Sequence, residues 1–452
     1  MKIILGVCPR IENLLQKSWI CAIFRFFSSN RATILLKKAK NSPKPSFPSL
    51  RFLFSDKLLG VCPRIENLLQ KSWICAVFRF FSSNRVTILL KKAKNRPKSR
   101  FPSLRFLFSD KLLVGLSLIL LNACHQQNRT KDMPEPISNN AVAIVASVNS
   151  HKLFSFNGLK SAKTWEDISQ SAYVFDKKWS ELKVPQSVLA VLASAAVSIG
   201  EKIYLIGGYT VDEKGQEKSV ATVHEYNTNN NQWKLVTHMP VPVDDTVALV
   251  YDKRYIYLIS GWHDTDNVRL VQVYDTVDDH WFNATPYQAP AVFGHSGGIV
   301  GNQMLICDGV KVVVKEKSRD FVASPVCMSG VIDSQDPRRI NWQKVPHHSQ
   351  KAYYRMAAVG DNENRRIVFA GGSDNPYNFD GIGYNGEPSI ASDKIYVYDL
   401  VAKKWQEYLD VIPQNMDHRA LLFDGQWFYI LGGMQEQQKV SKKVIKFKLP
   451  ML

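Results

Sequence analysis

The feature that most constrains the fold of this chain is a unit that recurs four times after residue 196. Each copy has two short apolar segments joined by a tight turn, a glycine where the second segment ends, and a third apolar segment. The copies begin with VSIGEKIYLIGGY (197–209), VALVYDKRYIYLISGW (247–262), AAVGDNENRRIVFAGGS (357–373) and ALLFDGQWFYILGG (420–433). Apolar alternation over short stretches is typical of β-strands, and no long segment has the 3.6-residue period of a helix. The sequence therefore predicts an all-β domain.

In three copies the third segment carries a Tyr, and a Trp that opens a fourth segment follows seven residues later. The pairs are Tyr226/Trp233, Tyr274/Trp281 and Tyr398/Trp405. Each unit predicts a four-stranded sheet in which strand two ends in glycine, because the chain turns where a Cβ would crowd. Two degenerate units, 141–182 with Trp179 and 292–345 with Trp342, bring the expected total to six. We expect a strand from about 133–139 to complete the last, three-stranded unit.

Four ordered copies of glycine, Tyr and Trp resemble the kelch repeat, whose period is about 50 residues. The resemblance covers nearly all of residues 141–449 and implies that 141–452 form a six-bladed kelch-type β-propeller. In kelch propellers, the loops that lead into strand one and the loops that join strands two and three build one functional face.

The part of the chain before this domain contains a tandem duplication. Residues 5–58 return as 59–112 with five differences over 54 positions, and residues 1–123 hold 23 Lys+Arg against 4 Asp+Glu. Residues 124–452 hold 35 basic and 36 acidic residues, so the whole net charge of +18 lies in this leader. A basic balance usually indicates nucleic acid or a membrane surface, but the near-neutral domain predicts no nucleic-acid partner. Two interpretations of residues 1–111 are open: a leader absent from the mature protein, or a membrane-lying segment.

A lipoprotein-type signal is predicted over residues 105–123. Basic Arg105 and Lys111 precede an apolar run, LLVGLSLILLNA, and then Cys124. The run is too short to span a bilayer, which needs about 20 residues, but it suits the core of a signal peptide. By this resemblance Cys124 is lipidated, residues 124–140 form a polar tether, and the protein is an outer-membrane lipoprotein or a periplasmic protein of the cell envelope.

The loops assigned to the functional face carry aromatic, acidic and cationic residues that could hold a carbohydrate or an acidic peptide. The competing interpretation is that Arg355 and Arg419 brace neighbouring loops through backbone carbonyls. The longest such loop, 371–394, is either a binding loop or a surface loop held by its own aromatics. The candidate ligand-binding residues are Asp245, Trp262, His263, His295, Tyr354, Arg355, Asp374, Asn375, Tyr377, His418 and Arg419.

Metal and cofactor chemistry is not expected from this sequence. His347 and His348 are adjacent, so on a strand their side chains would diverge, and we interpret them as exposed. The propeller resembles that of galactose oxidase, but no copper ligand set can be assigned. Cys307 and Cys327 either pair across a loop of about 20 residues or remain two buried thiols.

Two functions from different classes fit these observations. The first is a non-enzymatic binding module anchored to the envelope, with its ligand on the channel face. The second follows from a resemblance to N-acetylneuraminate epimerases, and implies a sugar mutarotase or epimerase with an acid–base pair and a cation for the sugar carboxylate. His295, Asp245 or Asp374 would serve the first role and Arg355 or Arg419 the second. The short loop at 261–270 departs from those epimerases, which carry a long insertion in a middle blade.

Overall fold

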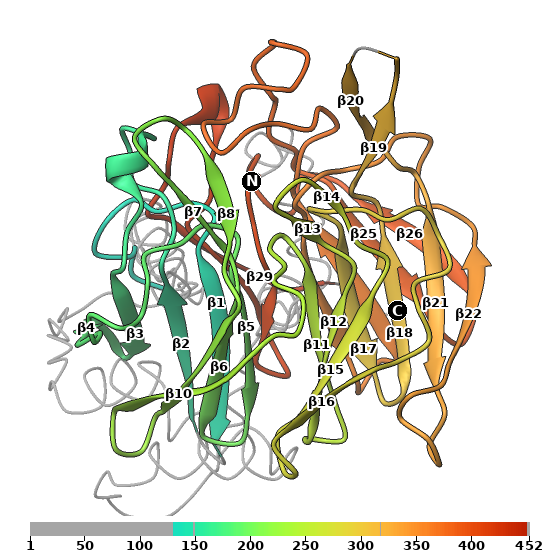
Figure 1. Cartoon of the computed structure of the whole chain (residues 1–452), viewed down its shortest axis with the longest axis horizontal. Helices are drawn as coiled ribbons and strands as arrows, with labels where there is room; N and C mark the ends of the chain where they lie inside the picture. The colour runs from blue at the N-terminus through green and yellow to red at the C-terminus, as the bar shows by residue number, and fades with distance from the viewer. Residues whose placement is uncertain (1–129, 148–149, 317, 450–452) are drawn as a thin grey trace, which may run out of the picture. The chain divides into compact units, whose positions relative to one another are not determined.

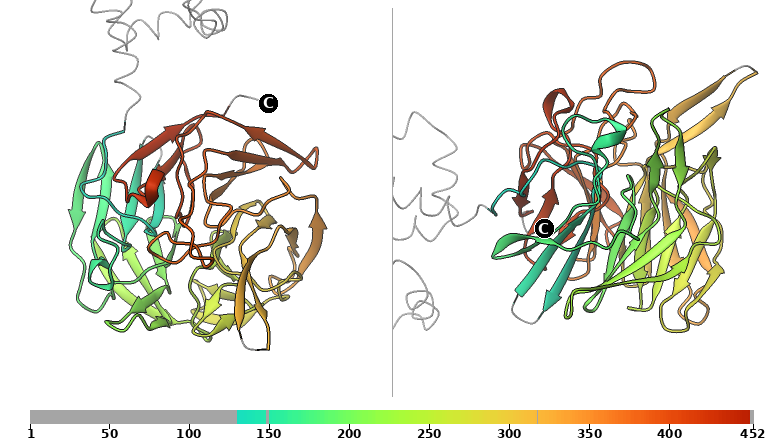
Figure 2. Two further views of the ribbon diagram at one scale, coloured as in Figure 1. Left: turned by 90° about the horizontal axis from the view of Figure 1, so that it is seen from above. Right: turned by 60° about the vertical axis from the view of Figure 1, so that its left-hand side comes forward.

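The structure, a computed structural model, describes residues 130–147, 150–316 and 318–449. Over these residues the chain is a six-bladed β-propeller, in which antiparallel sheets follow one another around a common centre (Figures 1 and 2). Blades one to five have four strands each and blade six has three, as the repeats predicted. From the centre outward, blade one consists of β1 Ala141–Ser147, β2 Ser150–Phe156, β3 Ala172–Asp176 and β4 Lys178–Leu182. Blade two consists of β5 Ala195–Ile199, β6 Lys202–Ile206, β9 Thr222–Asn227 and β10 Gln232–His238. Blade three consists of β11 Val247–Tyr251, β12 Tyr255–Ile259, β15 Val271–Asp275 and β16 His280–Asn283. Blade four consists of β17 Ser296–Val300, β18 Gln303–Cys307, β21 Cys327–Ile332 and β22 Ile340–Val345. Blade five consists of β23 Ala357–Asp361, β24 Arg366–Ala370, β25 Ile395–Asp399 and β26 Lys404–Tyr408. Blade six consists of β27 Leu422–Phe423, β28 Phe428–Leu431 and β29 Val444–Phe447.

One face of the propeller carries additional structure, which we call the loop face. It consists of the loops that lead into strand one of each blade and the loops that join strands two and three. Two short 3-10 helices lie in these loops, η1 Trp165–Asp167 and η2 Glu436–Gln438. The hairpin β19–β20 projects from the blades at the top of the view (Figure 1). The three hairpins of this face are β7 Tyr209–Val211 with β8 Glu217–Ser219, β13 Trp262–His263 with β14 Asp266–Asn267, and β19 Val310–Val314 with β20 Arg319–Ala323.

The first strands of all six blades surround a narrow central channel of about 200 Å³. Small and apolar side chains line it, because strand one turns its inner edge to the centre, where six strands converge. Representative lining residues, one from each blade, are Val142, Ala196, Val247, Gly297, Ala358 and Leu421. Ser198, Ser296 and Arg419 also reach the channel, but most of its lining is small or apolar, so a polar ligand finds few hydrogen-bonding side chains inside it.

The Tyr–Trp pairs of the repeat hold neighbouring blades together. Tyr226 and Trp233 are direct cross-strand partners with ring centroids 4.9 Å apart, and Trp233 also packs edge-on against Phe156 of blade one. The five fourth-strand tryptophans donate their indole N–H groups across to a neighbouring segment, four to backbone carbonyls and Trp281 to the Thr237 hydroxyl within β10. These bonds run from Trp179 to Lys131, Trp233 to Lys183, Trp281 to Thr237, Trp342 to Thr285 and Trp405 to Pro346.

The ring closes through residues 130–140, although not in the way we predicted. No strand is assigned to 133–139; instead the Met133 N–H donates to the Lys442 carbonyl, at 2.8 Å, and the Ile137 N–H donates to the Ser441 carbonyl. The Lys131 carbonyl accepts a hydrogen bond from the Trp179 indole N–H. This segment therefore occupies the position that, in other blades, belongs to the residues just after a fourth strand. Met133 and Ile137 are buried between blades one and six. The predicted polar tether, 124–140, is therefore wrong for 130–140, because these residues pack as part of the propeller.

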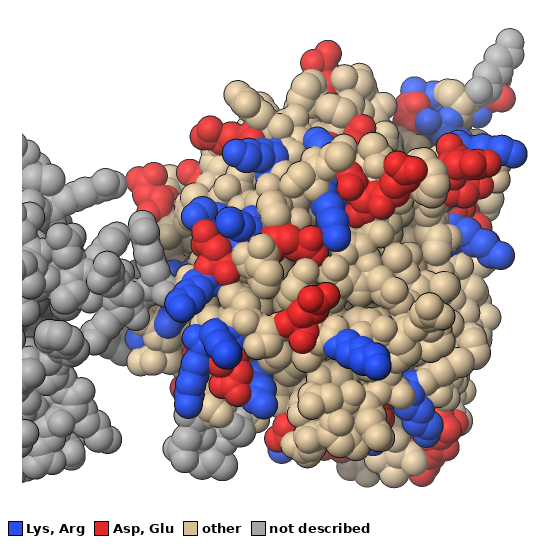
Figure 3. All heavy atoms as spheres, turned by 90° about the vertical axis from the view of Figure 1, so that its left-hand side faces the viewer, with Lys and Arg blue, Asp and Glu red and all other residues tan. Residues whose placement is uncertain are grey.

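The other predictions on the N-terminal part of the chain concern residues 1–129. The duplicated leader, the signal and Cys124 lie outside the described residues. Among the residues that are described, no helix is long and apolar enough to cross a membrane. On the side of the propeller that carries β3 and β4, basic and acidic side chains are interspersed (Figure 3).

Candidate binding face

A closed ring of backbone residues surrounds the channel mouth on the loop face. One residue just before strand one of each blade has a positive φ, between 50° and 73°, and each ring position is hydrogen-bonded to the next. The residues are Asn139, Ala193, Asp245, Gly294, Arg355 and Asp417. Backbone bonds join Asp245 to Ala193, Gly294 to Asp245, Arg355 to Gly294, His418 to Arg355 and Asn139 to Asp417, while the Asn139 side chain accepts from the Ala193 N–H.

Glycine is required at only one position of this ring. A Cβ added at Gly294 would overlap the ring of Tyr354, and φ there is +60°. The other ring residues pay a modest steric cost for a left-handed conformation, of about 1 kcal/mol for a residue such as Ala193. The repeated backbone geometry places the side chains of blades three, five and six over the channel.

Four of these side chains form a buried ion-pair network, which we call the central cluster: Asp245, Arg355, Asp417 and Arg419. The Arg355 guanidinium bonds Asp245 at 2.5 Å and Asp417 at 2.8 Å, and Arg419 pairs with the other oxygen of Asp245. Tyr354 donates its hydroxyl to Asp245 at 3.1 Å. Two guanidinium groups thus balance two carboxylates, and no member has more than 5% of its side chain exposed.

The surroundings of the central cluster set its protonation states. Burial alone would raise the pKa of Asp245, but Arg355 and Arg419 lower it to about 2. Two histidines of the same layer are held neutral: burial lowers the pKa of His295 to about 4 and that of His418 to about 3. His295 Nε2 bonds the Ile259 carbonyl at 2.8 Å, and His418 Nε2 bonds the Asn415 side chain at 2.7 Å.

The neighbour of Asp245 in the chain has the opposite protonation preference. Burial raises the pKa of Asp244 well above its ordinary value, although the Ser219 hydroxyl, 2.6 Å away, opposes the shift. Adjacent carboxyl groups with opposed pKa values are a common acid–base arrangement. Here both are buried, and Asp244 bonds the hairpin β7–β8 to blade three rather than facing solvent.

A layer of apolar side chains from the loops covers the central cluster. It draws on all six blades, for example Leu159, Tyr209, Trp262, Val310, Tyr377 and Met434. Tyr377 is fully buried and packs edge-to-face against Tyr354, with ring centroids 5.0 Å apart. The channel mouth is consequently closed by the protein's own side chains.

Three half-buried aromatic rings, Trp262, Phe321 and Tyr384, lie at the upper edge of this layer, and we call them the aromatic platform. Phe321 stacks on Tyr384, with centroids 4.3 Å apart and planes 24° apart, and Trp262 lies 5.9 Å from Phe321. The buried ring of Phe293 contacts all three from below. The platform therefore joins blades three, four and five, and each of its three residues is partly exposed.

The long loop 371–394 shapes one side of this surface. Its Asn375 side chain donates to Asn385 and to the Glu387 carbonyl, and a backbone bond from Tyr384 to Pro376 crosses the loop. Asp374 forms an exposed ion pair with Lys351 at 2.6 Å. The loop is folded upon itself, and it contributes Tyr384 to the platform and Tyr377 to the layer beneath.

The structure separates the predicted ligand-binding residues into two groups. Most of them bind one another: Asp245, His295, Tyr354, Arg355, Tyr377, His418 and Arg419 are buried at the channel mouth. Trp262, His263, Asp374 and Asn375 remain at least partly exposed. The idea that the two arginines brace loops through carbonyls needs correction, because their main partners are carboxylates; Arg419 also bonds the His418 carbonyl.

Several residues at this face and between blades four and five were not among the predicted site residues. Phe293 and Phe321 were missed, although the alternation in VKVVVKEKSRDFVA (310–323) marks a hairpin that could have drawn attention to Phe321. His347 and His348 were predicted to be exposed, which is wrong: both bond Asp308, and their side chains are 12% and 0% exposed. They lie after Pro346 in a bend, where adjacent side chains need not diverge.

Cys307 and Cys327 form a disulfide between directly paired residues of β18 and β21, with Cα atoms 4.1 Å apart. The sequence had left this pairing open beside the alternative of two buried thiols.

Comparison with known proteins agrees with this architecture. Residues 192–240 match the kelch motif. Kelch domain-containing protein 3 of Rattus norvegicus is 24% identical over 258 residues, which are 53% of this chain and 63% of that protein, so the chain spans less than two thirds of this relative's length. Kelch-like protein 38 of Mus musculus is 30% identical over 149 residues, 31% of this chain and 24% of that protein. The solved structure of YjhT covers 70% of this chain and 96% of its own, with a TM-score of 0.54 and 16% identity, which supports the fold alone. The chain is a six-bladed β-propeller that carries a kelch motif.

Proposed function

We propose that this protein is a non-enzymatic binding module whose ligand docks on the aromatic platform of the loop face. The observation that carries the proposal is the arrangement of Trp262, Phe321 and Tyr384, three partly exposed aromatic residues that all contact the buried ring of Phe293. Flat aromatic surfaces with a polar edge are common centres of recognition sites.

The most suitable ligand for this surface is a carbohydrate. Sugar rings offer C–H faces to aromatic rings and hydroxyl groups to nearby polar side chains, here His263 and Asn375, which are partly exposed. An acidic peptide fits less well, because Arg355 and Arg419 are already paired with Asp245 and Asp417. An unpaired guanidinium would be needed to hold a ligand carboxylate strongly.

The alternative function, a sugar mutarotase or epimerase, has one observation in its favour. Asp244 and Asp245 have opposed pKa shifts and could in principle supply an acid and a base. Both lie beneath the apolar layer, and the cations that would bind the sugar carboxylate are engaged. We therefore rank catalysis second.

The test uses the purified full chain in saturation-transfer NMR with a panel of neutral and sialylated oligosaccharides and an acidic peptide. We expect transfer to an oligosaccharide, with affinity at least about tenfold weaker in Tyr384→Ala. The matched control is Trp427→Ala, which removes a half-buried ring from the β27–β28 turn, on the opposite face. No transfer to any sugar, or an equal loss in the control, would refute the proposal. Anomeric equilibration faster than the spontaneous rate in the same spectra would favour the enzyme instead.

We also propose that Cys124 is lipidated and anchors the protein in the cell envelope. The sequence before Cys124 supports this, and the disulfide between Cys307 and Cys327 suits an oxidising compartment. Labelling cells with radioactive palmitate tests it: the full chain should incorporate label and the Cys124→Ser variant should not. Equal labelling of both would exclude this anchor.

A further inference from the structure

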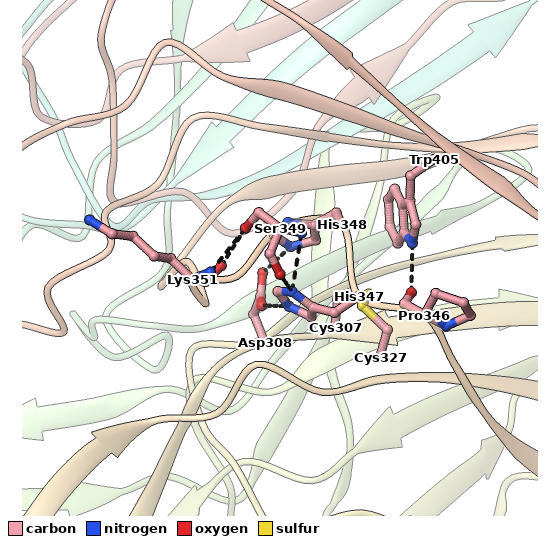
Figure 4. Close-up of a disulfide and its surroundings, with 9 residues drawn as sticks. All are labelled: Cys307, Asp308, Cys327, Pro346, His347, His348, Ser349, Lys351 and Trp405. Carbon is pink, nitrogen blue, oxygen red and sulfur yellow. Dashed lines mark hydrogen bonds and ion pairs between the residues drawn. A yellow bond between two sulfur atoms is a disulfide. The ribbon is translucent and has the colours of Figure 1, made fainter.

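A second buried polar cluster lies between blades four and five and shares no residue with the aromatic platform. We call it the seam cluster: Asp308, which follows the last residue of β18, and His347 and His348, which lie between β22 and β23 (Figure 4). Its ligating atoms all lie within 4.8 Å of one another.

Both imidazole rings point their Nε2 atoms at one carboxylate. His347 Nε2 lies 2.6 Å from one oxygen of Asp308, and His348 Nε2 lies 2.7 Å from the other. Asp308 and His348 have fully buried side chains, and 12% of the His347 side chain reaches solvent. Two nitrogen donors and one carboxylate oxygen are the ligand set of many three-residue zinc sites, in which water takes the fourth position.

The surroundings hold these ligands in place. His347 Nδ1 lies 2.5 Å from the Ser349 carbonyl, an outer hydrogen bond of the kind that orients metal-binding histidines. His348 stacks on Tyr396 of blade five, with ring centroids 4.2 Å apart, and its Nδ1 atom has no hydrogen-bond partner among the described residues. The disulfide lies directly beside the cluster, because Cys307 precedes Asp308 and Cys327 pairs with Val345 at the end of β22 (Figure 4).

The charge balance of the seam cluster also favours a cation. Asp308 is buried, and within the described part of the chain its ion-pair partners are these two histidines alone, with no Lys or Arg. A buried carboxylate without a permanent counter-charge is costly. A similar group near the surface, Asp275, Asp278 and His280, differs in this respect, because Arg254 already pairs with both aspartates.

We propose that Asp308, His347 and His348 form a binding site for a divalent transition-metal ion, with Zn²⁺ as the reference ion. The ion replaces the protons shared between the imidazoles and the carboxylate, so its binding releases protons to solvent. With bonds of about 2.0–2.1 Å in tetrahedral geometry, the nitrogen–oxygen separations widen to roughly 3.3 Å, which a rotation of the Asp308 carboxyl group provides. The ion would fasten the end of β18 in blade four to the segment that packs on blade five.

The experiment compares three forms of the full chain after removal of metal with a chelator: wild type, His347→Ala and His280→Ala. Equilibrium dialysis with Zn²⁺, followed by elemental analysis, measures stoichiometry, and Co²⁺ reports geometry through its visible absorption bands. We expect one tightly bound Zn²⁺ per wild-type chain, a tetrahedral Co²⁺ spectrum, and affinity at least about tenfold weaker in His347→Ala. The His280→Ala variant should bind as wild type does.

Thermal unfolding with and without Zn²⁺ keeps the proposal testable if a variant folds poorly. Added Zn²⁺ should raise the midpoint of the wild type and of His280→Ala but not that of Asp308→Asn, which keeps the shape of the side chain. Absence of bound Zn²⁺ in the wild type, or undiminished binding by His347→Ala, would overturn the proposal. Neither result depends on whether a ligand docks on the aromatic platform.

Discussion

The channel mouth and the seam between blades four and five are both organised by buried carboxylates, but they neutralise them differently. At the mouth, Asp245 and Asp417 face Arg355 and Arg419, whose charges are permanent. At the seam, Asp308 faces two imidazoles whose charge depends on bound protons or metal. The pKa values reflect this: burial lowers those of His295 and His418 at the mouth, whereas at the seam Asp308 raises that of His347 despite its burial. The charges at the mouth are therefore fixed, whereas the charge at the seam changes with bound protons or metal.

The largest expected effect comes from breaking the balance at the mouth. Arg355→Met leaves Asp245 short of one partner and Asp417 without its ion pair, so we expect a loss of about 3–5 kcal/mol in the free energy of unfolding. Urea denaturation measures it. The control, Arg339→Met, removes an exposed pair with Asp336 and should change little. A loss below about 1 kcal/mol for Arg355→Met would mean that the central cluster is not structurally important.

Beside the seam, a disulfide joins two strands of blade four, β18 and β21. Replacing both Cys307 and Cys327 with Ala should lower the free energy of unfolding by about 3 kcal/mol, as expected for a loop of this length. A reductant should destabilise the wild type by a similar amount and leave the double variant unchanged. If the reductant affects both proteins equally, the disulfide does not stabilise the folded protein.

The neutral histidines of the mouth predict a specific pH dependence. The pKa of His295 is about 4 in the folded protein and about 6.5 when unfolded, so its contribution is fully present above about pH 6.5. It is lost as the pH falls toward 4, because the unfolded chain then binds the proton more readily. Between pH 7 and pH 5 we expect the wild type to lose about 2 kcal/mol more than His295→Gln, which retains a donor for the Ile259 carbonyl.

Urea unfolding at several pH values checks this difference. Asp245 and Arg419 are the charged groups that act on His295, and both are unchanged in the variant. Parallel pH profiles for the two proteins would show that His295 is not held neutral.

The smallest expected effect concerns the backbone ring. Ala193 has a φ of +51°, which glycine adopts without strain, so Ala193→Gly should stabilise the protein by at most about 1 kcal/mol. Gly294→Ala, at the equivalent position of blade four, should destabilise it, because the new Cβ meets the ring of Tyr354. Thermal unfolding of both variants measures the contrast, and shifts of the same sign would contradict the ring's proposed geometry.

The repeat pattern predicted the blades well because strand alternation, glycine and the Tyr–Trp pair are local signals. Tyr226 and Trp233 are seven apart and meet across one tight turn, so sequence spacing alone defines their contact. The closure by residues 130–140 was harder to predict, since Met133 meets Lys442 only after the whole ring has formed.

The candidate site was predicted in composition but not in role. The sequence singled out Asp245, Arg355 and Arg419 as candidate ligand-binding residues, yet nothing local indicates that residues from three blades neutralise one another. His347 and His348 were misinterpreted because they were treated as strand residues. Pro346, which lacks an N–H group for pairing, marks the end of β22 and could have corrected this.

The hydrogen-bonded ring at the channel mouth has a consequence for the number of blades in the propeller. Each blade contributes one left-handed residue to the perimeter, and the bond from Asn139 to Asp417 closes it only when the sixth is in place. A chain with one blade fewer or one more would leave a gap or a surplus link in this loop. The number of blades is thus fixed by the ring of six left-handed backbone residues at the centre of the propeller, as well as by the width of each blade.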